Sequence, residues 1–477
     1  MSPVPRVIPH LTVLTPAQIE QIHQYALTIL STTGVRIDSA RAVDLIARRV
    51  GSAAVRDDRV YLPPEIVEWA VQSAPNTIDI DDRRGNRAFQ LGTGRTHFGI
   101  GVTNLHYQEP ETDQVVPFAR HHMVSSVRLG HMLPHYDVIS TPGVLQDLSP
   151  DIADLYAVLE MVANTTKPLV ILISNTGLFP ATLDLLEHLG VGRSDHPAVI
   201  PYFNPVTPLI INEETADKMF ATIERGLPFI YSNYSMVGMS TPITPAGALV
   251  LLNAELLAGL VLSQLIKEGT PVILGSLPAF FDMKTMIDFY DPHTILLNIA
   301  CAEMMGHYGL PHAGTSGSGV GWGPDLREAG MHWLNHLTAC LGKAGLVPFV
   351  GGVLGSMVFS PTAAIHAHDI IGQARYFARG FALDEESVGL DEIAEAGPGG
   401  HFLTSPLTLQ HYRDAYYVSD IYPNINLDTW GTQDNPRIID RLRDHTRELL
   451  ASAQAPDDHA DLLAKGEAFI EKLADQL

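Results

Sequence analysis

The chain is short of cysteine, of aromatic residues and above all of positive charge. Only Cys301 and Cys340 are cysteines among 477 residues, and no CxxC or CxxH spacing occurs, so we expect buried thiols in a reducing cytosol. Lysine and arginine total 30 against 53 aspartates and glutamates, which gives a net charge of −23. A field of that sign repels polyanions, so we expect no nucleic-acid partner, whereas a cationic substrate would be tolerated or attracted.

Signals for export and for a membrane anchor are also lacking. The opening MSPVPRVIPH has no apolar core of the kind found in signal peptides, so we expect a cytoplasmic protein. The most apolar stretch, residues 246–265, is long enough to span a bilayer, but Asn253, Glu255 and Gln264 interrupt it. The pattern therefore predicts a packed helix and no membrane association.

Common catalytic and ligand-binding motifs are absent as well. The sequence has no GxSxG, no HExxH, no Walker loop and no GxGxxG that opens a helix, which removes support for hydrolase and nucleotide-binding functions. The segment GTSGSGVGWG (314–323) matches a phosphate cradle in composition only, because it lacks the lysine. In HAHD (366–369) only His366 and Asp369 would share a helix face, and two ligands make a poor zinc site, so we expect no metal in the chain.

What the sequence does contain is an alternation of short apolar runs and helical segments. Near the N-terminus, Thr15 and Gln18 form the capping box of a predicted helix, and two more helices follow. The later alternation predicts an α/β fold, a (β/α)8 TIM barrel with an N-terminal helical extension and a C-terminal helical segment. A doubly wound open sheet is the alternative. The predicted strands are His97–Gly101, Asp137–Thr141, Leu169–Ser174, Ala198–Phe203, Pro228–Ser232, Pro271–Ser276, Leu310–Gly314 and Val347–Gly352.

This pattern divides the chain into three parts. Residues 1–95 are predicted to be a helical region that packs on the barrel, and residues 96–385 the barrel itself. Residues 386–477 are predicted to be a helical region that covers the barrel rim.

The predicted strands end in similar residues. Their ends read ISTPG, ISNTG, YFNPVTP, YSNYS, GSLPAFF, HAGTSGSG and GGVLGSM. Turn formation explains Gly, Pro, Asn and Ser at any one end, but it does not explain the rings of Tyr202, Phe203 and Tyr234. In a barrel all these ends meet at the C-terminal face, where active sites lie. A shared pocket of rings, amides and hydroxyls suits a quaternary ammonium, whose charge is attracted to each ring face by about 0.5–2 kcal/mol.

Longer segments resemble a known family. DLYAVLEMVANTTKPLVI (154–171), PITPAGALVLLNAELLAGLVLSQLIKEGTPVILGS (242–276), HDIIG (368–372) and GPGGHFLTSPLTLQHYR (397–413) resemble the trimethylamine methyltransferase family, in the branch without pyrrolysine that includes glycine betaine methyltransferases. The resemblance extends through nearly the whole chain. It implies a (β/α)8 barrel that passes a methyl group from a methylated amine to the cob(I)alamin of a separate corrinoid protein.

The resemblance also implies a substrate and a set of site residues. In the founding members pyrrolysine lies in the barrel cavity, and the corresponding loop here, around 312–322, holds only standard residues, so a quaternary amine such as glycine betaine is expected. Cobalamin would belong to the partner corrinoid protein, and a homo-oligomer is expected. Because the amine leaves as a neutral molecule, the enzyme chiefly positions the methyl group, and no catalytic residue is predicted. The predicted substrate-binding residues are Tyr202, Phe203, Tyr234, Trp322 and Phe359 as an aromatic cage, Asn204, Asn233, Ser276, His312, Thr315, Gly351 and Gly352 as polar contacts, and His401 and Phe402 at the rim.

Two departures from the family pattern touch the functional end of the fold. In LREAGMHW, His332 stands where the family often carries a glutamate, and after GGHFL a frequent His-Thr pair is replaced by Leu407-Thr408. Two alternative functions therefore stay open. One keeps the fold and pocket with another methyl acceptor, such as a folate, and the other is a non-catalytic protein that binds betaine-like ligands.

Overall fold

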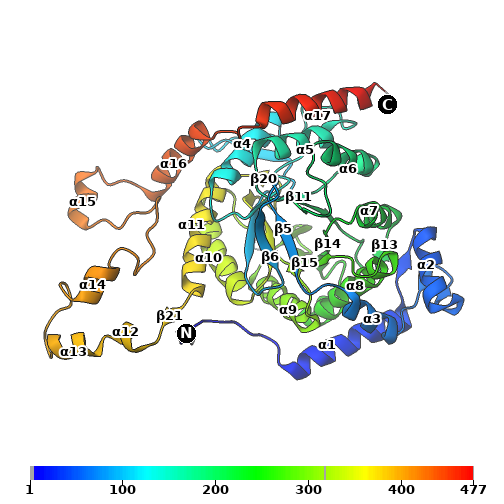
Figure 1. Cartoon of the computed structure of the whole chain (residues 1–477), viewed down its shortest axis with the longest axis horizontal. Coiled ribbons are helices and arrows are strands. Elements are labelled where there is room, and N and C mark those ends of the chain that lie inside the picture. Colours follow the sequence, from blue (N-terminus) through cyan, green and yellow to red (C-terminus); the bar gives the residue numbers. More distant parts are fainter. Residues whose placement is uncertain (1–4, 316–318, 476–477) are drawn as a thin grey trace.

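Eight parallel strands close into a barrel at the centre of the computed structural model, which describes residues 5–315 and 319–475 (Figure 1). The strands follow one another in the order β7-β10-β11-β12-β14-β15-β17-β18, and β18 pairs with β7 to close the ring. Each predicted strand coincides with one of them, which confirms the (β/α)8 fold. They are β7 (His97–Ile100), β10 (Val138–Ser140), β11 (Leu169–Ile171), β12 (Val199–Phe203), β14 (Phe229–Val237), β15 (Val272–Asp282), β17 (His312–Ala313) and β18 (Leu346–Val350).

Side chains along each strand alternate between the barrel lumen and the surrounding helices. Val138 of β10 belongs to the lumen cluster together with Ile200 and Ile230, whereas Ile139 belongs to the core beneath the helices. Strands of a parallel barrel are buried on both faces, so they read as continuous apolar runs without a polar face.

A ring of helices surrounds the barrel (Figure 1). Helix α8 is the one helix in the described ranges that is long and apolar enough to span a membrane, but 78% of its apolar window is buried inside the protein. The N-terminal helices α1 (Pro16–Thr28), α2 (Ala40–Val50) and α3 (Pro64–Ser73) pack against it, so α8 is a core helix. The ring consists of α4 (Arg120–Met132), α5 (Ala153–Asn164), α6 (Phe179–His188), α7 (Glu213–Glu224), α8 (Pro245–Ile266), α9 (Pro292–Tyr308), α10 (Leu326–Leu341) and α11 (Pro361–Ala378).

The capping box predicted at the start of α1 is present. The Gln18 backbone N–H donates to Thr15 Oγ1 at 3.3 Å, and the Thr15 N–H donates to Gln18 Oε1 at 2.8 Å. The first turn of α1 therefore has two of its free N–H groups satisfied by side chains.

A β-hairpin closes the N-terminal end of the barrel. Its strands are β5 (Ile78–Asp81) and β6 (Arg87–Leu91), and their inward side chains join the lumen cluster. Strand β6 was not among the predicted strands. Gly85 and Gly92 have φ of 82° and 84°, so they form the turns at either side of a strand that is only five residues long.

A small sheet lies beside the C-terminal end of the barrel. It has the order β19-β20-β8-β9 and joins the segments that follow β7 and β18. Its strands are β8 (His106–Gln108), β9 (Val115–Pro117), β19 (Gly352–Val353) and β20 (Val358–Phe359), and the remaining short strands are β1 (Arg6–Val7), β2 (Arg36–Ile37), β3 (Val55–Arg56), β4 (Arg59–Val60), β13 (Ile210–Ile211), β16 (Ile287–Phe289) and β21 (Phe381–Ala382).

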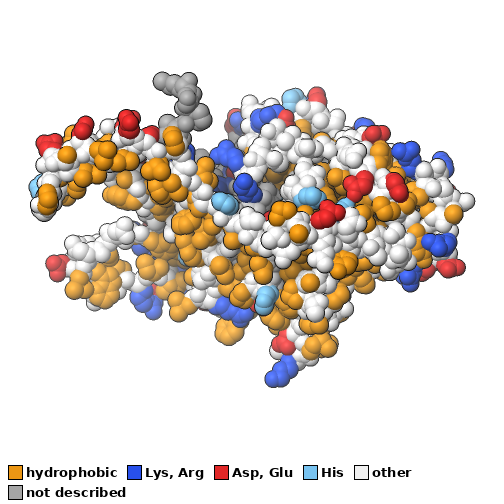
Figure 2. All heavy atoms as spheres, turned by 90° about the horizontal axis from the view of Figure 1, so that it is seen from below, with side chains coloured by type: hydrophobic (Ala, Val, Ile, Leu, Met, Phe, Trp, Pro, Cys, Tyr) orange, Lys and Arg blue, Asp and Glu red, His pale blue; other side chains and the backbone are white. Residues whose placement is uncertain are grey.

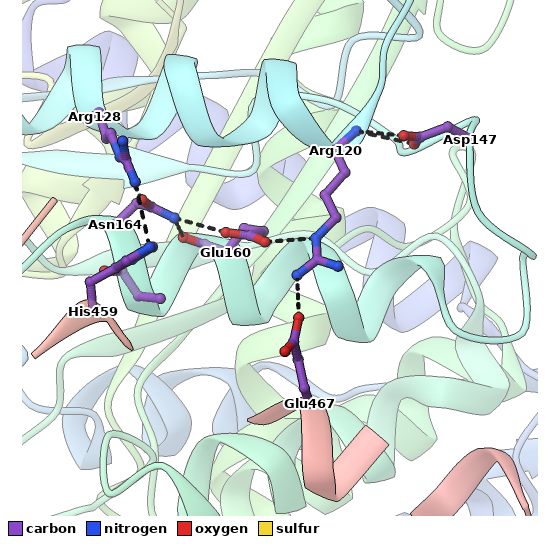
Figure 3. Close-up of polar contacts among 8 residues, drawn as sticks. Arg120, Arg128, Asp147, Glu160, Asn164, His459 and Glu467 are labelled. Atoms are coloured by element: carbon purple, nitrogen blue, oxygen red, sulfur yellow. Dashed lines mark hydrogen bonds and ion pairs between the residues drawn. The ribbon is translucent and has the colours of Figure 1, made fainter. Parts of the chain in front are cut away.

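The two C-terminal helices lie along the flank of the barrel. Helix α16 (Ile438–Ser452) packs on α11 and α4, and α17 (His459–Ala474) packs on α5 and α6. Arg120 of α4 links this layer together: its Nε donates to Glu160 on α5 at 2.7 Å, and its Nη2 donates to Glu467 on α17 at 2.9 Å (Figure 3). The structure thus places these helices beside the barrel and not over its rim, where we expected them.

Four short helices stand away from the body of the molecule (Figure 1). They belong to the segment between α11 and α16, which includes residues that were expected at the rim. They are α12 (Glu385–Val388), α13 (Leu390–Ala396), α14 (Pro406–His411) and α15 (Leu427–Thr432).

Candidate active site

Two strands continue beyond the barrel and build a wall above its C-terminal opening. The predicted strands end at Ser232 and Ser276, but in the structure their pairing continues to Val237 opposite Phe280. Strand β16 then turns back and pairs antiparallel with the end of β15. This ribbon brings residues 287–290 over the end of the lumen.

Three tyrosines from this region converge on one another. Tyr202 ends β12, Tyr234 lies on the extended part of β14, and Tyr290 follows β16. Burial raises the pKa of Tyr234 and of Tyr290, and for both of them the other phenols nearby raise the pKa further. Interactions of this kind act only over short distances, so the three phenols share one neighbourhood.

One carboxylate accompanies the tyrosines. The Tyr234 hydroxyl donates to Asp288 Oδ2 at 2.6 Å, and Asp288 also raises the pKa of Tyr290 through its charge. The short bond to an ionised acceptor is of the stronger kind. It fixes a negative charge beside the rings.

Tyr202 forms the floor of the cluster. Its ring meets Phe349 of β18 edge-on, with centroids 5.1 Å apart at 85°, and burial raises its pKa to about 12, although Ser232 and Asn204 lower it in part. Neither the Tyr202 hydroxyl nor that of Ser232 completes a well-oriented hydrogen bond within the described residues. Buried hydroxyls without well-oriented partners are costly, and of the two residues Tyr202 lines the neighbouring cavity.

A cavity of about 370 Å³ adjoins this floor. Tyr202 and Asn204 line it, together with Lys218 and Glu214 of α7. Burial lowers the pKa of Lys218, while the carboxylates of Glu214 and Asp154 act in the opposite direction. The cavity therefore offers a cation and an anion next to the tyrosine cluster.

The structure brings only part of the predicted set to this opening. Tyr202, Asn204 and Tyr234 lie there, and Thr315, at the end of β17, interacts with Tyr290. The predicted loop around 312–322 includes residues 316–318, which lie outside the described residues.

Asn233 and Ser276 face the surrounding helices instead, whereas Phe203 belongs to the outer core and also lines the cavity beside Tyr202. Phe203 packs between the rings of Phe179 and Phe229, and Asn233 donates to the Leu252 carbonyl and to Glu255 of α8 at 2.9 and 3.1 Å. Ser276 lies against the Cys301 thiol. Each of these three residues is next in sequence to a residue that faces the lumen. Successive side chains of a strand point to opposite faces, so these three point outward. The other polar partners of Glu255 are Thr207 Oγ1 and the Leu209 N–H.

His312 lies outside the opening. Its Nδ1 is 3.0 Å from the Ala344 carbonyl, and it lines a cavity with Gly92 and Gly94 at the N-terminal side of the barrel. Burial lowers its pKa to about 4. His312 is thus a neutral, buried residue at the opposite end from the tyrosines.

The remaining predicted residues lie at the periphery. Phe359 is fully buried beside Tyr107 in the small sheet, and Gly352 pairs with it there. The Gly351 carbonyl accepts the Ser360 N–H and is not directed at the tyrosines. Trp322 is 73% exposed on the loop after β17, and His401 and Phe402 are exposed among the outlying helices.

Asp288 and Tyr290 were missed. In the sequence they stand in IDFYDPH, directly before α9, and read as the approach to a capped helix. A pair of aromatic residues between two aspartates was the only available signal.

A second polar group is buried away from the opening. Glu328, His332 and His336 on α10 face His366 on α11, and the ring centroids of His332 lie 5.1 and 6.3 Å from those of His336 and His366. Burial and the neighbouring His366 lower the pKa of His332 to about 3. In residues 5–315 and 319–475 no three His, Cys, Asp or Glu side chains are grouped as a metal ion would require.

Comparison with known proteins places this site in context. The family model described as "Trimethylamine methyltransferase (MTTB)" matches residues 1–477. The chain belongs to the trimethylamine methyltransferase family.

Relatives within the family differ in their substrates. The chain is 26% identical to the glycine betaine methyltransferase of Desulfitobacterium hafniense (strain Y51), over 98% of both chains. It is 25% identical to the trimethylamine methyltransferase MttB1 of Methanosarcina acetivorans, over 96% of both. These relatives are methyltransferases, and each of the two alignments covers nearly the full length of both chains.

A solved structure supports the fold. The chain superimposes on the crystal structure of the monomethylamine methyltransferase of Methanosarcina barkeri with a TM-score of 0.58 and 10% sequence identity. The match covers 94% of this chain and 89% of the methyltransferase chain. That likeness confirms the barrel architecture.

Proposed function

We propose that this protein is a methyltransferase that moves a methyl group from a quaternary amine to the cob(I)alamin of a corrinoid protein. The observation that carries the proposal is the convergence of three tyrosines and Asp288 at the C-terminal opening of the barrel. Ring faces and a carboxylate attract a cation that cannot donate a hydrogen bond. The family membership supports methyl transfer as the reaction.

The proposed reaction asks for little acid–base chemistry. The Co(I) lone pair forms the Co–CH₃ bond, the C–N bond breaks, and its electron pair stays on nitrogen, so the amine leaves neutral and no proton moves. The protein holds one N-methyl group toward the incoming acceptor and excludes water. Once the nitrogen is neutral its attraction to the rings falls, which favours product release.

The loops around the opening suit a docking partner. They expose large apolar side chains after five different strands of the barrel, which is unusual for a surface left in water. We refer to these exposed apolar side chains as the apolar collar. Its members are Leu105, Met239, Met283, Met286, Trp322 and Leu354.

The adjoining cavity bears on the choice of amine. Lys218 lines it beside Tyr202 and Asn204, so an amine that also carries a carboxylate would meet a positive charge there. On this basis we propose a betaine as the substrate, in line with the glycine betaine methyltransferase among the relatives.

The test is to mix the purified protein with reduced free cob(I)alamin without oxygen and add glycine betaine, proline betaine, carnitine or choline singly. We expect methylcobalamin to form with a betaine faster than in the enzyme-free control. We also expect Lys218→Met to raise KM for the betaine and to leave any turnover of choline unchanged. If ligands raise Tm but no methylcobalamin forms, the acceptor or the catalytic role is different, and the corrinoid proposal fails.

A further inference from the structure

The outlying segment 384–412, here called the arm, has no core of its own. Its helices α12, α13 and α14 are four, seven and six residues long, and none of them contains a buried residue. Helices shorter than about 12–15 residues are marginal by themselves in water. The arm therefore needs another surface to hold it.

The arm is also unusually apolar for an exposed segment. Exposed fractions reach 66% at Leu390, 77% at Leu403 and 60% at Leu409. Its hydrogen bonds in the described structure are local, as between the Leu407 N–H and Glu392 Oε1 at 2.7 Å. Figure 2 shows hydrophobic side chains spread over the projections at this end of the molecule.

The charge of the arm has one sign. It contains no lysine or arginine, and its acidic residues all lie in or beside α12 and α13, so this part of the arm is negatively charged. The acidic residues are Asp384, Glu385, Glu386, Asp391, Glu392 and Glu395.

A groove of complementary character lies at the N-terminal end of the barrel. It has a volume of about 720 Å³ and an apolar lining that includes Ile8, Phe89 and Leu341. Arg95 and Lys343, both exposed, lie on its wall and form no ion pair within the described residues. In a chain with a net charge of −23, such a basic groove matches an acidic, apolar segment.

The root of the arm lies beside this groove. Arg379 lines the groove and ends α11, and strand β21, which pairs with β1, leads directly into the arm. The arm itself departs from the body of the molecule (Figure 1), and none of its residues lines the groove. Because the groove and the root of the arm are neighbours, two copies related by a two-fold axis can each place their arm in the groove of the other.

We propose that the arm docks into the basic groove of a second copy of this chain, in a two-fold dimer with exchanged arms. A permanent partner is required because the arm has no core, and a methyl acceptor that must leave after each turnover cannot supply one. The groove also lies at the end of the barrel opposite to the apolar collar, so the dimer leaves the opening free.

The test uses charge reversal on each side of the contact. Glu386→Lys/Glu395→Lys reverses part of the charge of the arm, and Arg95→Glu/Lys343→Glu reverses part of the charge of the groove. All four side chains are exposed, so these substitutions should leave folding of the chain intact. Sedimentation velocity at 1–20 μM (about the range where specific dimers persist) should show a dimer for the wild type. Each double variant alone should dissociate, with a dimer Kd raised roughly a hundredfold.

The decisive sample is the equimolar mixture of the two double variants. Each reversed arm then meets a reversed groove and each natural arm a natural groove, so the mixture should sediment as a dimer again. This recovery excludes misfolding as the cause of dissociation. A monomeric wild type, variants that stay dimeric, or folded variants whose mixture stays monomeric would each overturn the proposal. Leu326→Ser, at an exposed position away from arm and groove, is the matched control and should not change the dimer.

Discussion

The two ends of the barrel are built from the same strands and have opposite characters. At the N-terminal end, Ile80 and Phe89 of the β5–β6 hairpin fill the lumen with apolar side chains. At the C-terminal end, Tyr202, Tyr234 and Asp288 present hydroxyls, rings and a charge. The first arrangement stabilises the fold and the second leaves polar groups incompletely satisfied, which is the state expected of a binding site.

The largest expected effect concerns activity at the C-terminal end. Asp288→Asn removes the negative charge beside the rings, so we expect kcat/KM for the quaternary amine to fall roughly a hundredfold, with little change in Tm. The rate of methylcobalamin formation at several amine concentrations measures kcat/KM. Asp282→Asn, on the same hairpin but outside the cluster, should stay within about threefold of the wild type. Equal losses in both variants would mean that the hairpin matters and the charge does not.

The N-terminal end should show the reverse behaviour. Ile80→Ala leaves a cavity at a fully buried position, and we expect the free energy of unfolding to fall by about 2–5 kcal/mol. Urea unfolding measures this loss. Molecules that remain folded should keep their KM. Val115→Ala, at an exposed site, is the control, with an expected change below about 0.5 kcal/mol.

The pH dependence of stability should come partly from His312 at the same end. Its folded pKa of about 4 lies below the usual value of 6.5, so the unfolded chain binds the proton more readily between these values. Its contribution is complete above pH 6.5 and is lost as the pH falls toward 4, by about 3 kcal/mol in all. Unfolding curves at pH 7.5, 6 and 5 test this.

The control for the pH series is a substitution of the same kind elsewhere. His312→Leu should flatten the dependence over this range, whereas His293→Leu, which changes an exposed ring, should not. An unchanged slope in His312→Leu would show that other buried histidines, such as His332, dominate.

The smallest expected effect separates the ring of Tyr234 from its hydroxyl. Tyr234→Phe keeps the ring face and removes the donor to Asp288, so kcat/KM should fall by about tenfold. Tyr234→Leu should lose more, because the ring is removed too. Tyr25→Phe, at an exposed helix position, should change neither activity nor Tm. If Tyr234→Phe and Tyr234→Leu are equal, the ring does not contact the cation.

The strands of the barrel could be predicted closely, but the direction of their side chains could not. Ser232 and Asn233 are adjacent, yet the first faces the lumen and the second donates to Glu255 on α8. Both faces of the strand are buried, so no polar face marks which residues point inward. The same uncertainty separates Tyr202, at the opening, from Phe203, in the outer core.

Long-range pairing explains the residues that were missed. Asp288 and Tyr290 reach the tyrosines because β15 continues past the barrel and β16 folds back on it. His312, in contrast, is close in sequence to the strand-seven loop but lies at the opposite end of the barrel. Proximity along the chain was a poor guide to proximity at the site.

The sequence by itself determined the eight strands, the helices between them, the capped first helix and the family, because these depend on local patterns of apolar, capping and turn residues. The tertiary structure alone decided which strand residues face the lumen, how a carboxylate comes to lie beside three tyrosines, and that the segment 384–412 leaves the body of the protein. Those features arise from contacts between residues far apart in the chain, and a pattern of neighbouring residues carries no record of them.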